Sequence, residues 1–292
     1  MKKAKLMRMK VGEGILIYGV IGLFILLALV PFLCLISGSF SESDLLRDYG
    51  VALWPRGFTA DAYRLIFMFP EDILNSYYYS ILITVIGTIG NMLLLTSVAY
   101  VLSRPALRGK KYMSMFFFFT LMFNPGIVPT FILYDYLGMY DTIWALIFPG
   151  MMSVGYLYLL RAFFDGLPAE LYESAHLDGA NEFTIMLRIA VPLITPGLST
   201  VTFYSVLNYW NDGYTGLIYA QEIVPVAIYL SRITNYIDFL KNGLGTNMGG
   251  IEVPDDTMIY AMSIVATGPM LVIFVFFQKY FVRGLTAGSV KG

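Results

Sequence analysis

Charged residues are scarce in this chain. Only 13% of its 292 residues are Asp, Glu, Lys or Arg, whereas 58% are hydrophobic and 16% are aromatic. A soluble domain usually carries about 25% charged residues. Together with a mean hydropathy of +0.69, this shortage of charge argues against an ordinary water-soluble domain and predicts a chain embedded in a lipid bilayer. Because no segment beyond the short basic start at residues 2–10 is strongly basic, we expect no nucleic-acid partner.

Cysteine and histidine are almost absent, with one residue of each, Cys34 and His176. A single cysteine excludes a disulfide within the chain, and so few ligands make a metal site or a metal-based catalytic centre unexpected. Cys34 lies within an apolar run and is interpreted as a small apolar residue. The phosphate-binding pattern G-x-x-x-x-G-K-[ST] is also missing, so any ATP hydrolysis must take place on another chain.

Long charge-free runs are prominent instead. A bilayer core about 30 Å thick is crossed by roughly 20 apolar residues in a helix. Six runs approach or exceed this length, at residues 15–41, 73–103, 112–134, 142–160, 189–211 and 257–278. We therefore predict an all-α polytopic membrane protein with six transmembrane helices within residues 15–281, preceded by segment 1–14 and followed by tail 282–292. Pro192 and Pro196 predict that the fifth helix begins after them.

The distribution of Lys and Arg orients these helices. Six spans place both termini on one side of the membrane, and the side richer in Lys and Arg is the cytoplasmic one. With the termini inside, fourteen Lys and Arg residues fall in inner segments and five in outer segments. Both termini are therefore expected in the cytoplasm. The basic start would also suit a signal peptide cut near residues 37–39, but the first run is longer than a cleavable apolar core, which favours an uncleaved helix.

Two larger segments are then expected outside the membrane. Residues 41–72 include a short amphipathic stretch, Thr59 to Phe67, that predicts a helix capped by Thr59. Residues 220–256 are acidic and contain a glycine-rich tip at residues 243–250. Neither segment is long enough to form a domain.

A polar stretch, residues 167–192, lies between the fourth and fifth spans and is expected in the cytoplasm within a loop at residues 161–192. Pro168 suits the first position of a helix. Gly179 is a natural helix end, because it tolerates a left-handed backbone. Asn181 can cap a second short helix, which Pro192 would end. The pattern predicts a helix, a glycine turn and a second helix.

One face of the first helix could dock on a partner. Leu171 and Ala175 are four residues apart and share a face, and Glu173 projects from a neighbouring side. A small apolar face with a carboxylate can enter a groove on another protein. The alternative is an ordinary intracellular loop packed on the membrane surface, and spacing alone does not decide between the two.

The same stretch resembles a known motif. Glu173-Ser174-Ala175 is followed after three residues by Gly179, after nine more by Ile189, and then by Pro192. This spacing resembles the EAA motif of the membrane subunits of ABC importers. The chain departs from the family form at Ser174, where an alanine is usual, and at Val191, where a leucine precedes the proline.

The C-terminal residues 280–292 are similar to the tail of maltose-type permease subunits in the carbohydrate uptake family. Further similarities are Asn75-Ser76, Asp178-Gly179-Ala180 and Trp210-Asn211-Asp212. The resemblance implies the type I ABC importer transmembrane fold. It also implies a role in importing a carbohydrate, with features closer to the branch that takes up oligosaccharides or polysaccharide fragments.

The resemblance assigns roles to particular residues. The Glu173 carboxylate would meet a basic residue in a cleft of the ATPase, and Gly179 would make the turn. The whole set expected to couple to the ATPase is Glu173, Ser174, Ala175, Asp178, Gly179, Ala180, Ile189 and Pro192. The tail residues expected to contact the ATPases are Arg283, Gly284, Leu285, Thr286, Gly288 and Lys291.

The resemblance also implies partners and a location. These are a second homologous permease subunit, two ATPase subunits that carry ATP and Mg²⁺, and an extracellular solute-binding protein that contacts the outer segment 220–256. No cofactor is expected on this chain. The location implied is the bacterial cytoplasmic membrane.

Polar residues near the outer end of the fifth span suggest a path for a sugar. Polar groups at that depth are costly in lipid and usually face a bundle interior or water. The candidate path residues are Asn208, Tyr209, Trp210, Asn211 and Asp212. An interfacial aromatic belt that includes Trp210 and Tyr214, and a helix–helix hydrogen bond from Asn208, are open alternatives. The residues expected to serve in a belt or in packing rather than as sugar contacts are Tyr78, Tyr79, Tyr134, Trp144 and Tyr156.

Two other classes of function compete with a permease subunit. An ion-coupled secondary transporter usually needs buried ionisable residues, and the spans offer only Asp212, near an end. A membrane-embedded enzyme is disfavoured because the spans contain no histidine-rich cluster and no visible nucleophile–base pair.

Overall fold

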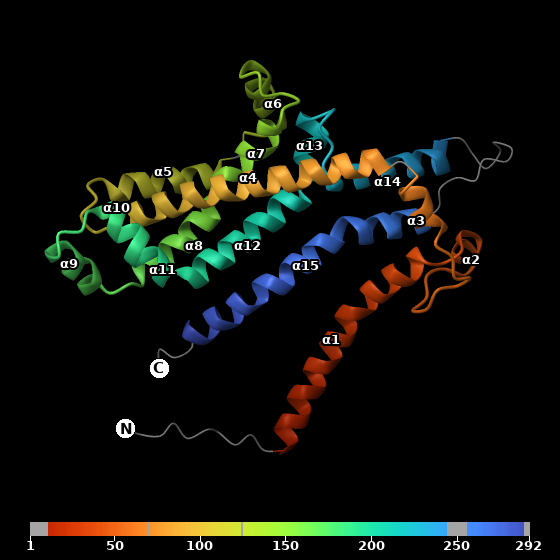
Figure 1. Cartoon of the computed structure of the whole chain (residues 1–292), viewed down its shortest axis with the longest axis horizontal. Helices are drawn as coiled ribbons and strands as arrows, with labels where there is room; N and C mark the ends of the chain where they lie inside the picture. The colour runs from red at the N-terminus through yellow and green to blue at the C-terminus, as the bar shows by residue number, and fades with distance from the viewer. Residues whose placement is uncertain (1–10, 69, 124, 244–255, 289–292) are drawn as a thin grey trace. The chain divides into compact units, whose positions relative to one another are not determined.

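The computed structural model describes residues 11–68, 70–123, 125–243 and 256–288. Within these ranges the regular structure is helical, without strands, as the composition predicts. The chain forms two compact units (Figure 1), one of Met1–Phe69 with Ile233–Ala266 and the other of Pro70–Arg232 with Thr267–Gly292.

The first unit contains α1 (Val11–Ser39), α2 (Ser43–Tyr49), α3 (Asp61–Ile66) and the start of α15 (Asp256–Gly288). The ring of Tyr260 packs on Gly38, where an added Cβ would lie 2.7 Å from Tyr260 Cδ2. The Tyr63 hydroxyl donates to Ser39 Oγ at 2.9 Å, which ties α3 to the end of α1. The backbone N–H of Asp61 donates to Thr59 Oγ1 at 3.2 Å, although the helix itself begins after Ala60 rather than at Thr59.

The second unit is built around the long helix α4 (Pro70–Ser103), which packs against α7, α8 and α12. Figure 1 shows α8 and α12 beside α4, with α5 running along it. Its other helices are α5 (Lys110–Met122), α6 (Ile127–Tyr136), α7 (Ile143–Met151), α8 (Val154–Asp165), α9 (Ala169–Leu177), α10 (Glu182–Ile185), α11 (Val191–Leu193), α12 (Thr195–Asn211) and α13 (Tyr214–Tyr219), with a π-turn, η1 (Met186–Ala190), between α10 and α11. Helix α14 (Val226–Gly243) begins in this unit.

The predicted spans correspond to three straight helices and three bent pairs. Among the described residues, Gly14–Ser39, Pro70–Ser103 and Asp256–Gln278 are single helices long and apolar enough to cross a membrane. The pairs α5–α6, α7–α8 and Glu182–Leu193 with α12 are bent by 111°, 43° and 84°. Counting each pair once gives up to six spans, which agrees with the six charge-free runs.

The bends follow proline and glycine. Pro125 lacks a backbone N–H, and Gly126 has φ +85° between α5 and α6, so the helix cannot continue through them. Pro149 lies in the last turn of α7. The second helix ends at Leu193, one residue after Pro192, and the break falls at Ile194. The fifth helix likewise begins one residue before Pro196, which occupies its first turn.

Asn91 of α4 satisfies the backbone groups that the break between α7 and α8 leaves free. Its Nδ2 donates to the carbonyl oxygens of Gly150 and Met151 at 2.9 and 3.0 Å. Its Oδ1 accepts from Ser205 Oγ of α12 at 2.7 Å. Because unpaired carbonyls are costly where water is excluded, a single buried amide joins three helices and makes the broken span tolerable.

The ring of Tyr209 of α12 fills the space between α4 and α7. An added Cβ at Gly87 of α4 would lie 2.5 Å from Tyr209 Cζ, and one at Gly150 would lie 2.7 Å from it. The Tyr209 hydroxyl donates to Ile147 O at 2.9 Å. The two glycines therefore let the ring lie against both helices, and the hydrogen bond fixes its position.

Candidate functional site: the loop between the fourth and fifth spans

The polar stretch folds as the two short helices that the sequence predicts. Helix α9 ends at Leu177, and Gly179 has φ +77°. The N–H of Gly179 donates to His176 O, and the N–H of Ala180 donates to Ala175 O, both at 3.0 Å. This is the Schellman arrangement of a helix C-terminus, in which a left-handed residue and the residue after it each donate a backbone N–H to a carbonyl of the last turn.

The second helix begins where Asn181 caps it. The N–H of Thr184 donates to Asn181 Oδ1 at 2.8 Å, as expected for an N-cap. The helix then widens through the π-turn, where the N–H of Val191 bonds to Met186 O, five residues earlier. At the start of the first helix, Pro168 is the cap rather than the first helical residue, so α9 begins at Ala169.

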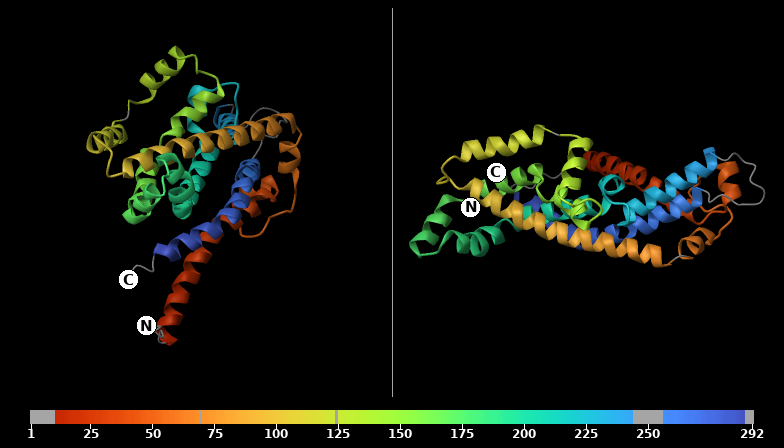
Figure 2. Two further views of the ribbon diagram at one scale, coloured as in Figure 1. Left: turned by 60° about the vertical axis from the view of Figure 1, so that its left-hand side comes forward. Right: turned by 90° about the horizontal axis from the view of Figure 1, so that it is seen from above.

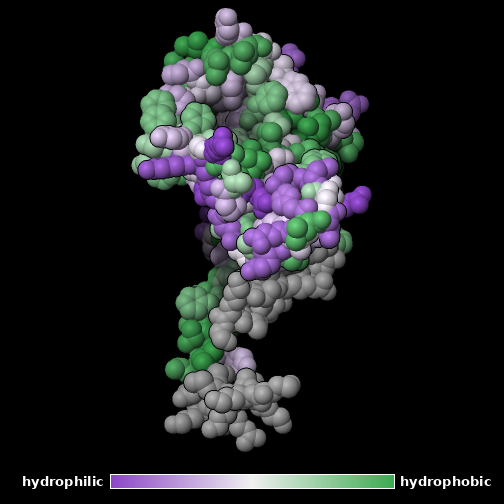
Figure 3. Space-filling view, turned by 90° about the vertical axis from the view of Figure 1, so that its left-hand side faces the viewer, coloured by the Kyte–Doolittle hydropathy of each residue, from purple (hydrophilic) through white to green (hydrophobic). Residues whose placement is uncertain are grey.

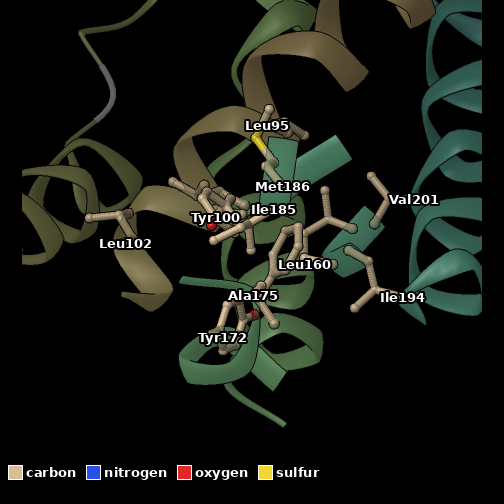
Figure 4. Packing of buried hydrophobic residues seen from close by; sticks show 14 residues of the cluster. Leu95, Tyr100, Leu102, Leu160, Tyr172, Ala175, Ile185, Met186, Ile194 and Val201 are labelled. Atoms are coloured by element: carbon tan, nitrogen blue, oxygen red, sulfur yellow. The ribbon is translucent and has the colours of Figure 1, made fainter. Parts of the chain in front are cut away.

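The motif residues divide between the surface and the core. Glu173, Ser174, Asp178, Gly179 and Pro192 are exposed, whereas Ala180 and Ile189 are half-buried. Ala175 is only 5% exposed and packs, with Tyr172, into a core that includes Leu160, Phe164 and Ile185. Figure 4 shows Tyr172 and Ala175 pointing from α9 into this cluster.

This burial bears on a choice that the sequence left open. The face shared by Leu171 and Ala175 could have docked on a partner, but Ala175 packs against the chain's own helices. The side of α9 that carries Glu170 and Glu173 remains exposed, together with Leu177, which is 90% exposed. Figure 3 views the side on which α9 and α10 lie; hydrophilic residues gather in the middle of this view, with hydrophobic residues above them.

A cluster around Arg104 holds the two short helices against the end of α4. The Arg104 guanidinium lies over the ring of Tyr172, with Cζ 3.9 Å from the ring centroid. Its Nη2 is 3.4 Å from Glu182 Oε1 of α10, and Glu182 Oε2 accepts from the Tyr100 hydroxyl at 2.5 Å. His176 Nε2 is 3.3 Å from Glu182 Oε1. Burial raises the pKa of Tyr172, with Arg104 partly offsetting this, so the contact is between a cation and a neutral ring.

Sequence reasoning missed this cluster. Arg104 and Glu182 are separated by 78 positions, and neither belongs to the motif. The available signal was a basic residue directly after a long apolar run, which the charge count used only to orient the spans.

A cavity of about 620 Å³ lies where α7, α8 and α12 meet. Of the residues predicted to form the sugar path, Asn208, Asn211 and Asp212 line it. The remaining lining residues are Pro149, Gly150, Tyr156, Tyr204, Leu207 and Thr215. The rings of Tyr156 and Tyr204 stack at its wall, with centroids 6.0 Å apart and planes 17° apart.

The other two predicted path residues point away from the cavity. Tyr209 and Trp210 are 5% and 4% exposed; Tyr209 bonds to Ile147, as described above, and Trp210 contacts the ring of Tyr77 of α4. A helix places consecutive residues about 100° apart, so Asn208 and Asn211 can share one side while Tyr209 and Trp210 face another. Tyr156, expected to be a belt or packing residue, lines the cavity instead.

The tail continues α15. The helix runs to Gly288, so Arg283, Gly284, Leu285, Thr286 and Gly288 are helical and the expected boundary at residue 281 does not interrupt the chain's regular structure. Lys291 lies outside the described residues. Across the part of the chain that the structure describes, no group of His, Cys, Asp and Glu side chains could hold a metal ion.

Comparison with known proteins defines the class. Residues 106–287 match the family described as the binding-protein-dependent transport system inner membrane component. The chain belongs to this family. It is therefore a multi-pass, non-catalytic subunit of an ABC transporter in the bacterial cytoplasmic membrane, and ATP hydrolysis takes place on a separate subunit. Membership of this family excludes the two competing classes, an ion-coupled secondary transporter and a membrane-embedded enzyme. The EAA motif and the coupling helix are typical of the family.

Particular relatives cover nearly the whole chain. It is 35% identical over 279 residues to the polygalacturonan/rhamnogalacturonan transport system permease protein YtcP of Bacillus subtilis (strain 168), covering 95% of this chain and 97% of that protein. It is 29% identical to the arabinooligosaccharides transport system permease protein AraQ of the same organism, covering 91% and 92% of the two chains.

A solved structure has the same fold. A chain from the crystal structure of a bacterial ABC transporter involved in the import of the acidic polysaccharide alginate matches with a TM-score of 0.79 and 26% identity, covering 92% of this chain and 96% of that chain. The type I ABC importer fold expected from the resemblance is thereby confirmed.

Proposed function

We propose that this chain is one of two homologous membrane subunits of an importer that moves a carbohydrate, an oligosaccharide or polysaccharide fragment, into the cytoplasm. Two ATPase subunits carrying ATP and Mg²⁺ would drive it, and an extracellular solute-binding protein would deliver the sugar to the outer segment 220–256. The relatives that transport such saccharides support the substrate class.

The coupling role is supported by the burial of one side of α9 and the exposure of the other. Its inner face is fixed in the core by Tyr172 and Ala175, and its end is fixed by the Gly179 turn. Glu173 is exposed on the opposite side, free to meet a basic residue of an ATPase. A helix fixed on one side and bound on the other transmits a rigid-body displacement, because it cannot yield at its base.

The experiment that tests this role compares two carboxylates on α9. Glu173→Ala should leave the subunit inserted but abolish sugar-stimulated ATP hydrolysis and uptake in the reconstituted importer. A desolvated interfacial charge pair is typically worth about 2–5 kcal/mol when one partner is removed. Glu170→Ala is the matched control, because Glu170 is also exposed and lies at the helix start, where its charge adds only about 0.3–1 kcal/mol to helix stability. Uptake by the Glu173 variant at the level of the Glu170 variant would refute the assignment.

The cavity supports a path for a saccharide. Asn208, Asn211 and Asp212 supply amide and carboxylate groups that can bond sugar hydroxyls, and Tyr156 and Tyr204 supply ring faces that suit the apolar face of a pyranose. Asp212 Oδ1 already accepts from the N–H of Thr215 at 2.9 Å, which holds the carboxylate at the cavity wall. The buried Tyr209 and Trp210 are assigned to the packing of the wall behind them.

The helical tail residues Arg283, Gly284, Leu285, Thr286 and Gly288, with Lys291 beyond them, are proposed to contact the ATPase subunits. The support for this assignment is their similarity to the tail of the maltose-type subunits.

A further inference from the structure

Helix α9 has no short covalent connection to α4. It leads back to α8 through Gly166–Pro168 and forward to α12 through α10, η1 and α11. Displacement of α9 can therefore reach α8 and α12 along the chain, but it can reach α4 only through side-chain contacts. Figure 2 shows α9 and α10 close to the C-terminal end of α4 in both views.

Arg104 provides the polar part of that contact. It lies one residue beyond the end of α4, and its side chain is only 15% exposed. The guanidinium contacts α9 through the ring of Tyr172 and the imidazole of His176, whose Nε2 is 3.4 Å from Nη2. It reaches α10 through the carboxylate of Glu182, which the Tyr100 hydroxyl of α4 also holds.

We propose that Arg104 is the positioning residue that makes the end of α4 move together with α9 and α10. This inference rests on the proposed coupling role of α9 and extends it from the loop to a span. An arginine suits the task because its planar guanidinium can stack on a ring and bond a carboxylate at the same time, whereas a lysine ammonium offers only a point charge. Arg104 itself touches neither nucleotide nor sugar.

Other residues of α4 connect this helix to the wall of the cavity. Asn91 of α4 holds the carbonyl oxygens of Gly150 and Met151, and Gly87 of α4 receives the Tyr209 ring. Gly150 is also part of the cavity wall. Movement of α4 with α9 would therefore shift the cavity wall as the ATPases close, which makes α4 a second route from the loop to the cavity beside α12.

A distance measurement tests the shared motion. Spin labels are attached through Ser97→Cys on the exposed side of α4 and Glu170→Cys on α9, in a Cys34→Ser background, and the complete importer is reconstituted in nanodiscs. With Arg104 present, the distance between the labels should be the same without nucleotide and with ATP trapped by vanadate. With Arg104→Ala, trapping should change or broaden it. A distance that changes equally in both proteins, or in neither, would overturn the proposal.

A functional measurement uses the ratio of sugar imported to ATP hydrolysed. Arg104→Ala and Arg104→Lys should each lower this ratio by about tenfold, the scale of a typical coupling interaction, while the ATPases stay bound. Tyr172→Leu removes the ring from the other side of the contact and should lower the ratio as well, which provides a second test if Arg104→Ala does not insert. Lys111→Ala, at an exposed basic residue nearby, is the control and should leave the ratio unchanged.

The coupling role of α9 and the positioning role of Arg104 can be tested separately, because different variants contradict them. If α9 does not couple the ATPases at all, Glu173→Ala transports normally. If Arg104 alone is misassigned, Glu173→Ala is inactive while Arg104→Ala, Arg104→Lys and Tyr172→Leu keep the normal ratio of import to hydrolysis.

Discussion

At the level of single residues, Gly179 gives a test of backbone conformation without steric interference. Its φ is +77°, and a Cβ added there would meet no atom within 4 Å. Gly179→Ala should therefore destabilise the turn by roughly 1–2 kcal/mol through backbone strain alone. Gly179→Asn should cost less, because asparagine adopts the left-handed region more readily. Melting temperature of the purified importer and ATP-dependent uptake measure both effects.

Gly179→Pro serves as the extreme case. Proline fixes φ near −65° and removes the N–H that donates to His176 O, so uptake should be lost. Equal uptake by the alanine and asparagine variants would mean that the left-handed backbone is not what the position requires.

Tyr204 tests the ring surface of the cavity. Its ring is 45% exposed and stacks with Tyr156. Tyr204→Phe keeps the ring and should retain most of the uptake. Tyr204→Leu keeps apolar bulk but loses the flat face and should reduce uptake about two- to tenfold, in line with the roughly 0.5–1.5 kcal/mol assigned to a ring–ring contact. The measurement is the initial rate of uptake of labelled oligosaccharide. Equal rates for the two variants would remove the ring from the path.

Some residue roles were predictable from the sequence and others were not. The turn at Gly179 and the cap at Asn181 follow from local backbone preferences, so spacing predicts them. The inward direction of Ala175 and the place of Tyr156 in the cavity depend on how separate helices pack, which local preferences do not contain. The Arg104 cluster depends on the same packing.

At the level of elements, the charge-free runs predict where the helices lie but not how they bend. The run at 73–103 differs from α4 only in its first residues, because a long apolar helix satisfies its own backbone. The break between α7 and α8 is different. It is stable because Asn91, about 60 residues away, bonds the freed carbonyls, and no pattern within the fourth run shows that such a partner exists.

Two glycines of α4 provide a matched test of helix packing. At Gly87 an added Cβ would lie 2.5 Å from Tyr209 Cζ, and that ring is buried and hydrogen-bonded. Gly87→Ala should therefore destabilise the protein by about 1–3 kcal/mol through overpacking. At Gly90 the added Cβ would meet the terminal methyl of Met151, which can rotate away, so Gly90→Ala should be nearly neutral. Thermal unfolding in detergent separates them, and equal loss of stability would contradict the fixed position of the Tyr209 ring.

At the level of the whole molecule, membrane orientation connects the loop to its partner. The excess of Lys and Arg in the inner segments predicts that α9 faces the cytoplasm, where ATP is present, and that the end of α6 faces outward. Two exposed residues report these sides, Leu177 on α9 at 90% exposure and Tyr136 at the end of α6 at 86%. Each can be replaced by cysteine in a Cys34→Ser background without disturbing a buried contact.

A membrane-impermeant maleimide should label Tyr136→Cys in intact cells stripped of their wall and should label Leu177→Cys only after permeabilisation. Binding of the purified ATPase to inside-out vesicles should in turn protect Leu177→Cys, but not Tyr136→Cys, from the reagent. Labelling of Leu177→Cys in intact cells would reverse the orientation and separate α9 from the ATPases. The coupling proposal and the Arg104 proposal both require α9 on the cytoplasmic side of the membrane. This experiment therefore tests a requirement that the two proposals share.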